Sequence, residues 1–419
     1  MKRVKMALAL LASALLLFSC YWTPQTGSGE FSIKFVGAPK GVGDSYARVY
    51  LLTEGNVLVP IGQDTDYAEA KISEGDTEVT VKGIPAGPRY KVLVSKGVQQ
   101  AGWFEVAQYA ESGLFEVSPG ETQDVAVTLL DNPFTYSNRM GVSMKGVVAT
   151  DEPKIYAVSA SALYSGATVD AMSTAVPVTA GYTINSISRG NPEPVWVNTD
   201  KGILPYSGVF GANLPNLGAV NVLDSGIYTP LIYYQRDGGL GGAIQDEWDW
   251  LHIDLSDIVS GQPVRDFVIP NDTYGYFTTK FGALRLDRNI IGQTDPDIND
   301  YALFFEAGSN KNPILALDYK SAAPNFVMGT GDGVWTSNDP AINPSAQVSG
   351  TSGFSFYLVA ASGANWAALS PYYLFIGNGS IVMVIFPFNA GLPGTVTGMI
   401  WNVDTLIISG TEGLVAITP

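Results

Sequence analysis

The chain has 419 residues, with 39 Asp and Glu against 23 Lys and Arg and a formal net charge of −16. Such an acidic chain repels phosphate backbones, which excludes nucleic acid as a partner. One cysteine and one histidine exclude an intrachain disulfide and any site that needs two histidines or two thiols.

The N-terminal segment has the features of an export signal. Lys2, Arg3 and Lys5 precede an apolar run from Met6 to Phe18, which is shorter than the roughly 20 residues of a membrane span. The run ends in LFSC at Cys20, which resembles the lipobox of bacterial lipoproteins. The resemblance implies removal of residues 1–19 and lipid attachment at Cys20. The protein would then be anchored in the bacterial cell envelope, on its periplasmic or its outer side. An ordinary cleaved signal, with Cys20 discarded or left as a free thiol, is the alternative.

Residues 20–29 are typical of a flexible tether, and residues 30–131 predict a β-sandwich. Apolar and polar residues alternate over 31–35, 48–52, 77–81, 90–94 and 124–129, with Gly- and Pro-rich turns between them. The stretches VKGIPAGPRYKVLV (81–94) and FEVSPGETQDVAVTL (115–129) resemble transthyretin-like or carboxypeptidase-regulatory-like domains. That resemblance implies an Ig-like spacer or adhesive module.

Residues 135–419 contain a repeated strand, polar turn and strand, which predicts a β-propeller. The turn positions are Ala162, Gly202, Gly238, Gly282, Gly333, Gly379 and Gly413. Their mean spacing is about 42 residues, the length of one four-stranded blade. The pattern resembles bacterial propeller repeats of the two-component regulator and photosystem-assembly types. We expect an all-β chain with seven blades, and six or eight remain alternatives.

The ends of this repeat region predict how the ring closes. The chain ends at Pro419, a few residues after its last hairpin, so the last blade lacks an outer strand. Residues 140–148 could supply that strand and remove an exposed edge.

The first candidate ligand site is aromatic. Trp248 and Trp250 alternate with polar residues on the way to His252, and Tyr233 and Tyr234 lie in a neighbouring predicted strand. An aromatic surface beside carboxylates suits a sugar or a peptide. The alternative is a blade strand that buries both tryptophans.

The second candidate is a calcium loop. Asp295, Asp297 and Asn299, with Glu306 at position twelve, have the ligand spacing of such a loop. Asp300 stands where the sharp turn needs glycine, and Pro296 is a further misfit, so an acidic inter-strand loop is the favoured interpretation. Apart from Ca²⁺ at this loop, we expect no cofactor.

These features predict a lipid-anchored envelope protein that acts through its propeller surface without catalysis. The expected partners are the membrane, through the N-terminal lipid, and an envelope protein, peptide or glycan. One alternative is a propeller-fold glycoside hydrolase or lyase that uses acidic residues at the channel mouth. Another alternative is a surface-exposed adhesin. Because propellers host unrelated functions, the fold alone does not choose between them.

Overall fold

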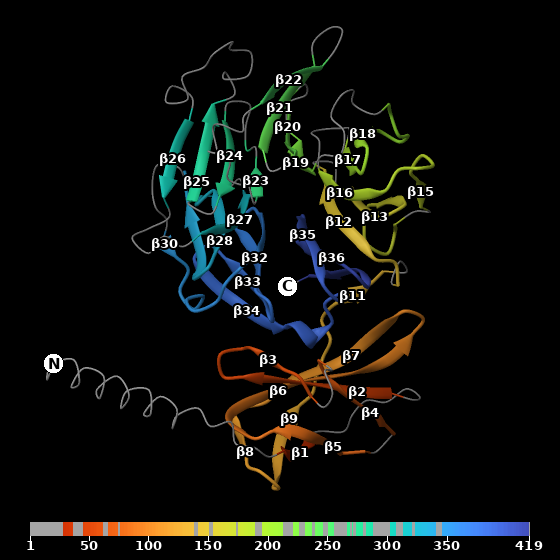
Figure 1. The fold of residues 1–419 in the computed structure, drawn as a ribbon, viewed down its shortest axis with the longest axis vertical. Coiled ribbons are helices and arrows are strands. Elements are labelled where there is room, and N and C mark those ends of the chain that lie inside the picture. Colours follow the sequence, from red (N-terminus) through yellow and green to blue (C-terminus); the bar gives the residue numbers. More distant parts are fainter. Residues whose placement is uncertain are drawn as a thin grey trace, which may run out of the picture. The chain divides into compact units, whose positions relative to one another are not determined.

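The computed structural model describes residues 28–36, 45–61, 66–73, 76–137, 141–150, 154–172, 175–188, 195–212, 221–225, 231–236, 239–245, 250–254, 266–268, 270, 274–279, 282–287, 302–306, 313–320, 323–340 and 346–418. They fall into two compact units, which Figure 1 shows as mainly β-structure, with one short 3-10 helix at Phe388–Ala390. The first unit contains the chain up to Gln100, Phe104–Asn132 and Asn389–Gly391, and the second contains the rest. Within the described ranges, no helix has the length and apolar character that crossing a membrane requires.

The first unit contains two sheets. One has the order β5-β1-β9, formed by β1 (Ser28–Val36), β5 (Glu78–Pro85) and β9 (Thr122–Thr128). The other has the order β10-β7-β6-β2-β3, in which β4 also pairs with β2 and β8 with β6. Its strands are β2 (Ser45–Thr53), β3 (Leu58–Val59), β4 (Ala68–Ile72), β6 (Gly87–Gln100), β7 (Trp103–Glu111), β8 (Phe115–Val117) and β10 (Leu130–Asp131).

One hydrophobic core joins these two sheets. Alternate residues of β1, namely Phe31, Ile33 and Phe35, are buried in the same cluster as Val49 of β2 and Val92 of β6. The alternation follows from the strand period of two, which sends every second side chain to one face. The five strands predicted between residues 31 and 129 are confirmed.

The second unit is a succession of small antiparallel sheets. In chain order, their strands are β12 (Met144–Ala149), β13 (Ile155–Ser159), β14 (Ala162–Gly166) and β15 (Val176–Pro177); β16 (Ile184–Ser188), β17 (Val195–Thr199) and β18 (Gly202–Tyr206); β19 (Asn221–Ser225), β20 (Leu231–Arg236), β21 (Gly239–Gln245) and β22 (Trp250–Asp254); β23 (Asp266–Val268), β24 (Tyr274–Thr279), β25 (Gly282–Asp287) and β26 (Ala302–Glu306); β27 (Ile314–Tyr319), β28 (Phe326–Thr330), β29 (Gly333–Ser337) and β30 (Ala346–Gln347); β31 (Leu358–Ser362), β32 (Asn365–Leu369), β33 (Tyr373–Asn378) and β34 (Ile381–Pro387). A last sheet has the order β11-β37-β36-β35, from β11 (Thr135–Tyr136), β35 (Val396–Asn402), β36 (Thr405–Gly410) and β37 (Gly413–Ile417).

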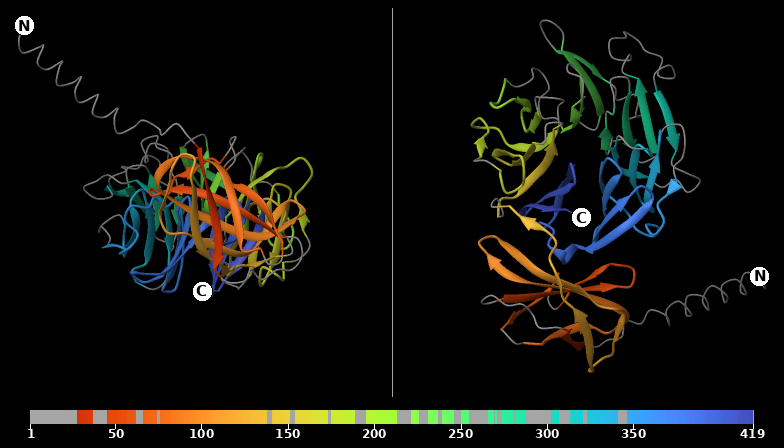
Figure 2. Two further views of the ribbon diagram at one scale, coloured as in Figure 1. Left: turned by 90° about the horizontal axis from the view of Figure 1, so that it is seen from below. Right: turned by 180° about the vertical axis from the view of Figure 1, so that it is seen from behind.

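The sheets form a ring through one strand of each. Strands β12, β16, β19, β23, β27, β31 and β35 contact one another in that order, and β35 contacts β12 again. Figure 2 shows the second unit from behind, with its sheets set around a common centre. Hydrogen bonds cross some of these junctions: Leu317 N donates to Asp266 Oδ2 over 2.8 Å, and Ala361 N donates to Asp318 Oδ2 over 2.7 Å. This is the arrangement of a β-propeller.

The strands on either side of the ring's closure differ from the prediction. Residues 140–148 do not form the outer strand of the last sheet, because β12 pairs with β13 and lies on the ring. The outer strand is instead β11, which pairs Thr135 with Ala416 and Tyr136 with Val415. Thr397 Oγ1 of β35 also donates to Met144 O over 3.1 Å. The two ends of the second unit therefore meet in one sheet, as predicted, but a shorter and earlier segment supplies the strand.

One predicted turn lies in the wrong hairpin. Ala162, Gly202, Gly282, Gly333 and Gly413 each begin the third strand from the ring of their sheets. Gly379 instead follows β33, and the equivalent turn precedes Tyr373. Tyr373 lies 40 residues after Gly333 and 40 before Gly413, so the repeat is more regular than the sequence indicated.

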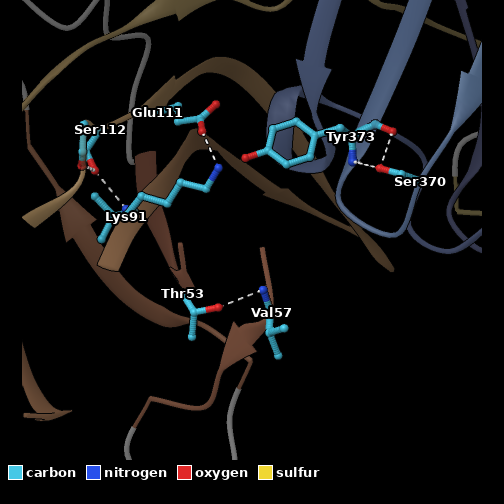
Figure 3. A network of polar contacts seen from close by, with 9 residues as sticks. Thr53, Val57, Lys91, Glu111, Ser112, Ser370 and Tyr373 are labelled. Atoms are coloured by element: carbon cyan, nitrogen blue, oxygen red, sulfur yellow. Dashed lines mark hydrogen bonds and ion pairs between the residues drawn. The ribbon is translucent and has the colours of Figure 1, made fainter. Parts of the chain in front are cut away.

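A hydroxyl group closes the turn before Tyr373 in place of a glycine. The Ser370 Oγ donates to Tyr373 O and accepts from Tyr373 N, both over 3.1 Å (Figure 3). Thr330 Oγ1 donates to Gly333 O over 3.0 Å at the corresponding place in the preceding sheet, four strands earlier in the chain. A side chain that bonds locally to the backbone stabilises a turn without the positive φ that favours glycine.

Candidate interaction surface

Most of the predicted site residues lie outside the described part of the chain. These are Cys20, Trp248, Asp295, Asp297 and Asn299. Glu306, the last residue of the proposed calcium spacing, is the last residue of strand β26. Among the described residues, no group of three or more His, Cys, Asp or Glu side chains could hold a metal ion.

The backbone brings the remaining aromatic candidates into one sheet. Tyr233 and Tyr234 lie on β20, Trp250 and His252 lie on β22, and β21 separates the two strands. Tyr234 pairs with Gly241 of β21, whereas Trp250 pairs with Gln245 at the other end of the same strand, so the two residues are separated along the sheet. The aromatic-surface hypothesis therefore stays a prediction for this sheet.

Asp332 has a structural role in the turn between β28 and β29. Its Oδ1 accepts from Gly353 N over 2.6 Å and from Ser352 Oγ over 3.3 Å. Its backbone oxygen accepts from Trp335 Nε1 and Gln347 Nε2. Asp332 thus holds the loop around Gly353 in place.

A half-buried ion pair lies between the β23–β26 and β27–β30 sheets. Arg285 Nη1 is 2.7 Å from Asp339 Oδ2, and the guanidinium lies 4.5 Å from the centre of the Tyr274 ring. Burial, followed by the negative charge of Asp339, raises the pKa of Tyr276 to about 12. A tyrosine with this pKa stays protonated at neutral pH, so it suits a structural hydrogen-bonding role better than proton transfer.

Lys320 is a second unusual group, in the segment after β27. The residue is 2 % exposed, and its ammonium nitrogen has no hydrogen-bond partner among the described residues. Burial lowers the pKa of Lys320 because the charged form loses its hydration. A buried amine without access to solvent gives no route for a ligand.

The most distinctive surface is a row of apolar side chains on β34, which we call the β34 row: Ile381, Met383 and Ile385. They are 68 %, 59 % and 44 % exposed. The strand lies at the edge of its sheet and, among the described strands, pairs only with β33. Neither strand of this hairpin contains a charged residue. Native sheets usually protect an edge by shortness, charge or proline, so a long uncharged edge is unusual.

Other outer strands in the described part of the second unit are protected in those ways. Strands β11, β15 and β30 have two residues each, and β15 contains Pro177. The strands β22 and β26 end in Asp254 and Glu306. Strand β34 has seven residues and its only proline, Pro387, is at its end. The β34 row is therefore an exception within its own unit.

The neighbouring strands hold the β34 row in position. Trp366 is fully buried and donates from Nε1 to Gly379 O over 2.9 Å, which fixes the turn before β34. A side chain at position 377 would overlap the Trp366 ring, so glycine is required where β33 passes it. Val382 packs against the core cluster that contains Trp366 and Phe375.

The register of the hairpin shifts once, at Met383. Gly377 is level with Val382 and Ile376 with Val384, so Met383 has no cross-strand partner. Such a bulge bends the strand and redirects a side chain, and bulges are frequent at sheet edges and beside functional sites. Sequence reasoning missed this surface because a continuous apolar run is typical of a buried strand.

Comparison with known proteins shows the fold. No family model matches the sequence, and no curated protein is significantly similar to it. Virginiamycin B lyase from Staphylococcus aureus is similar to 68 % of this chain, over 97 % of its own, with a TM-score of 0.52 and 12 % identity. The extracellular domain of BT4673 from B. thetaiotaomicron, which is described as a one component system, matches 68 % of this chain and 39 % of its own, with a TM-score of 0.50 and 13 % identity. The neighbours are β-propeller-like proteins, so the second unit has a propeller-like fold.

Proposed function

We propose that this protein is a lipid-anchored envelope binding or scaffold protein, which holds a protein partner at the surface of its propeller without catalysis. The observation that carries the proposal is the β34 row, an exposed and uncharged apolar strand on an otherwise acidic chain. Exposed apolar patches of this kind mark interaction sites in soluble proteins. The anchor is Cys20, as the lipobox resemblance implies, and the first unit serves as an Ig-like spacer.

Seven sheets in ring order support a seven-bladed assignment of the propeller within the described residues. Closure by β11 from before the first sheet favours a rigid ring, since the two ends share one sheet. A rigid ring suits a scaffold, because its outer strands keep their positions when a partner binds.

The roles of the carboxylates favour binding over catalysis. Among the described acids of the ring strands, Asp266 and Asp318 accept backbone N–H groups of the next sheet. Asp339 pairs with Arg285 and Asp332 holds a loop. Acid–base hydrolysis needs a pair of carboxyl groups that face a substrate, and these four groups have structural partners instead.

Co-purification from native envelope tests the proposed function. The full-length chain carries a C-terminal tag, the membrane is gently solubilised, and mass spectrometry identifies both the partners and the lipid on the N-terminus. A stoichiometric protein partner supports the proposal. Recovery of the lipidated protein alone contradicts it and favours a soluble ligand or substrate. An unlipidated N-terminus contradicts the assignment of Cys20.

A further inference from the structure

The β34 row indicates what kind of partner the protein takes, an inference that rests on the proposed function. We propose that Ile381, Met383 and Ile385 dock an extended apolar segment of a partner protein, with basic residues on either side of that segment. The site would then be a preformed apolar strip on a chain with a net negative charge.

The strip is apolar and preformed. Its three side chains are exposed along one paired edge strand, and Val382 and Val384 between them are partly buried. A strand fixed by β33 and by the Trp366 core loses little conformational freedom on binding. Methionine at the centre, released from cross-strand pairing by the bulge, can adapt to different side chains.

The shape of the strip selects an extended occupant. The three exposed side chains follow one edge strand on both sides of the bulge, and a second extended chain along that edge presents its own side chains beside them. A strand edge also leaves backbone N–H and C=O groups for such a chain to pair with. An extended segment therefore matches both the row and the edge beside it.

Charge decides between a second copy and a different protein. Two copies of a chain with net charge −16 repel each other, and the hairpin Tyr373–Pro387 has no charged residue to offset that repulsion. A partner with basic residues is attracted by the same field, which speeds encounter and disfavours wrong partners. The occupant is thus a basic-flanked apolar segment and not another copy.

Labelled peptides test this inference on the full-length protein. The probe has alternating Val and Thr with two Lys at each end, and two comparison probes replace either Lys by Glu or Val by Ser. Fluorescence anisotropy should show the first probe binding at least tenfold more tightly than both others. The double variant Ile381→Ser/Met383→Ser should weaken that binding at least tenfold. The control Val36→Ser, which removes an isolated valine that is 57 % exposed on β1, should change it less than twofold.

Three results would overturn the inference. One is equal binding of the three probes, and another is unchanged binding by the double variant when its circular dichroism and melting midpoint match the wild type. The third is a wild-type dimer in sedimentation that the double variant abolishes, which would make a second copy the occupant. If the double variant still retains the envelope partner found by co-purification, the proposed function stands and only this docking site fails.

Discussion

Strands β9 and β34 have the same length and the same place in their sheets, yet their outward side chains differ. Both have seven residues and both lie at a sheet edge. The outward residues of β9 are Thr122, Asp124, Ala126 and Thr128, and Asp124 pairs with Lys34 of β1 over 2.6 Å. The outward residues of β34 are isoleucine, methionine and isoleucine. Polar and charged outward residues protect β9 from pairing, and β34 lacks that protection, which is the difference on which the proposed docking site rests.

The largest expected effect comes from removing the support of β34 while leaving β9 intact. Trp366→Ala deletes a fully buried side chain and the bond to Gly379 O, and we expect a loss of about 3–5 kcal/mol in unfolding free energy. Urea unfolding, followed by hydrogen–deuterium exchange of peptides from each unit, measures the change. Only the transition of the second unit should shift, because the first unit has a separate core.

The matched variant is Phe31→Ala, since Phe31 is fully buried in the first unit. It should lower the other transition by a similar amount. A single transition that moves equally in both variants would show that the units unfold together and that β9 and β34 do not have independent supports.

A second prediction concerns Lys320, a polar residue in the core, whereas the β34 row consists of apolar residues at the surface. The β34 row exposes apolar groups, whereas Lys320 buries an amine that hydrogen-bonds to none of the residues the structure describes. Lys320→Met keeps the length of the side chain and removes the amine. We expect about 1–3 kcal/mol of added stability at pH 7, the usual cost of an unsatisfied buried polar group. Chemical unfolding of both proteins gives the difference, and the exposed Lys145→Met is the control, with a change near zero.

The pH dependence of this effect follows from the lowered pKa of Lys320. The folded pKa lies below the unfolded value of about 10.5, so between these values the unfolded chain binds more protons. The wild type should therefore gain stability as pH rises towards 10.5, and its difference from Lys320→Met should shrink. A difference that stays constant from pH 7 to pH 10 would contradict the assignment of a perturbed amine.

The repeats could be predicted from the sequence because each depends on local turn and strand chemistry. The prediction failed for features that long-range packing determines. Turns rich in glycine were found, but the turn before Tyr373 uses Ser370 and Pro371, so the stronger Gly-Asn-Gly signal around Asn378 was chosen instead. Two-residue β11 is too short to produce any pattern. The exposure of β34 and the burial of Lys320 depend on neighbours far along the chain, which periodicity cannot reveal.

The smallest expected change in stability comes from making β9 resemble β34. The double variant Asp124→Val/Ala126→Ile replaces two outward residues of β9 and breaks the Lys34 pair. That pair is exposed on both sides, so its loss should cost less than about 1 kcal/mol. The edge would then be long, apolar and uncharged, and we expect new self-association or binding of the basic-flanked Val/Thr peptide. Analytical ultracentrifugation and anisotropy measure both, with Asp124→Asn as the control that removes charge without adding apolar surface.

If the double variant stays monomeric and binds nothing, an apolar edge alone is insufficient to make a strand a docking site. The bulge at Met383, which β9 lacks in its pairing with β1, would then be the feature that makes β34 a docking strand.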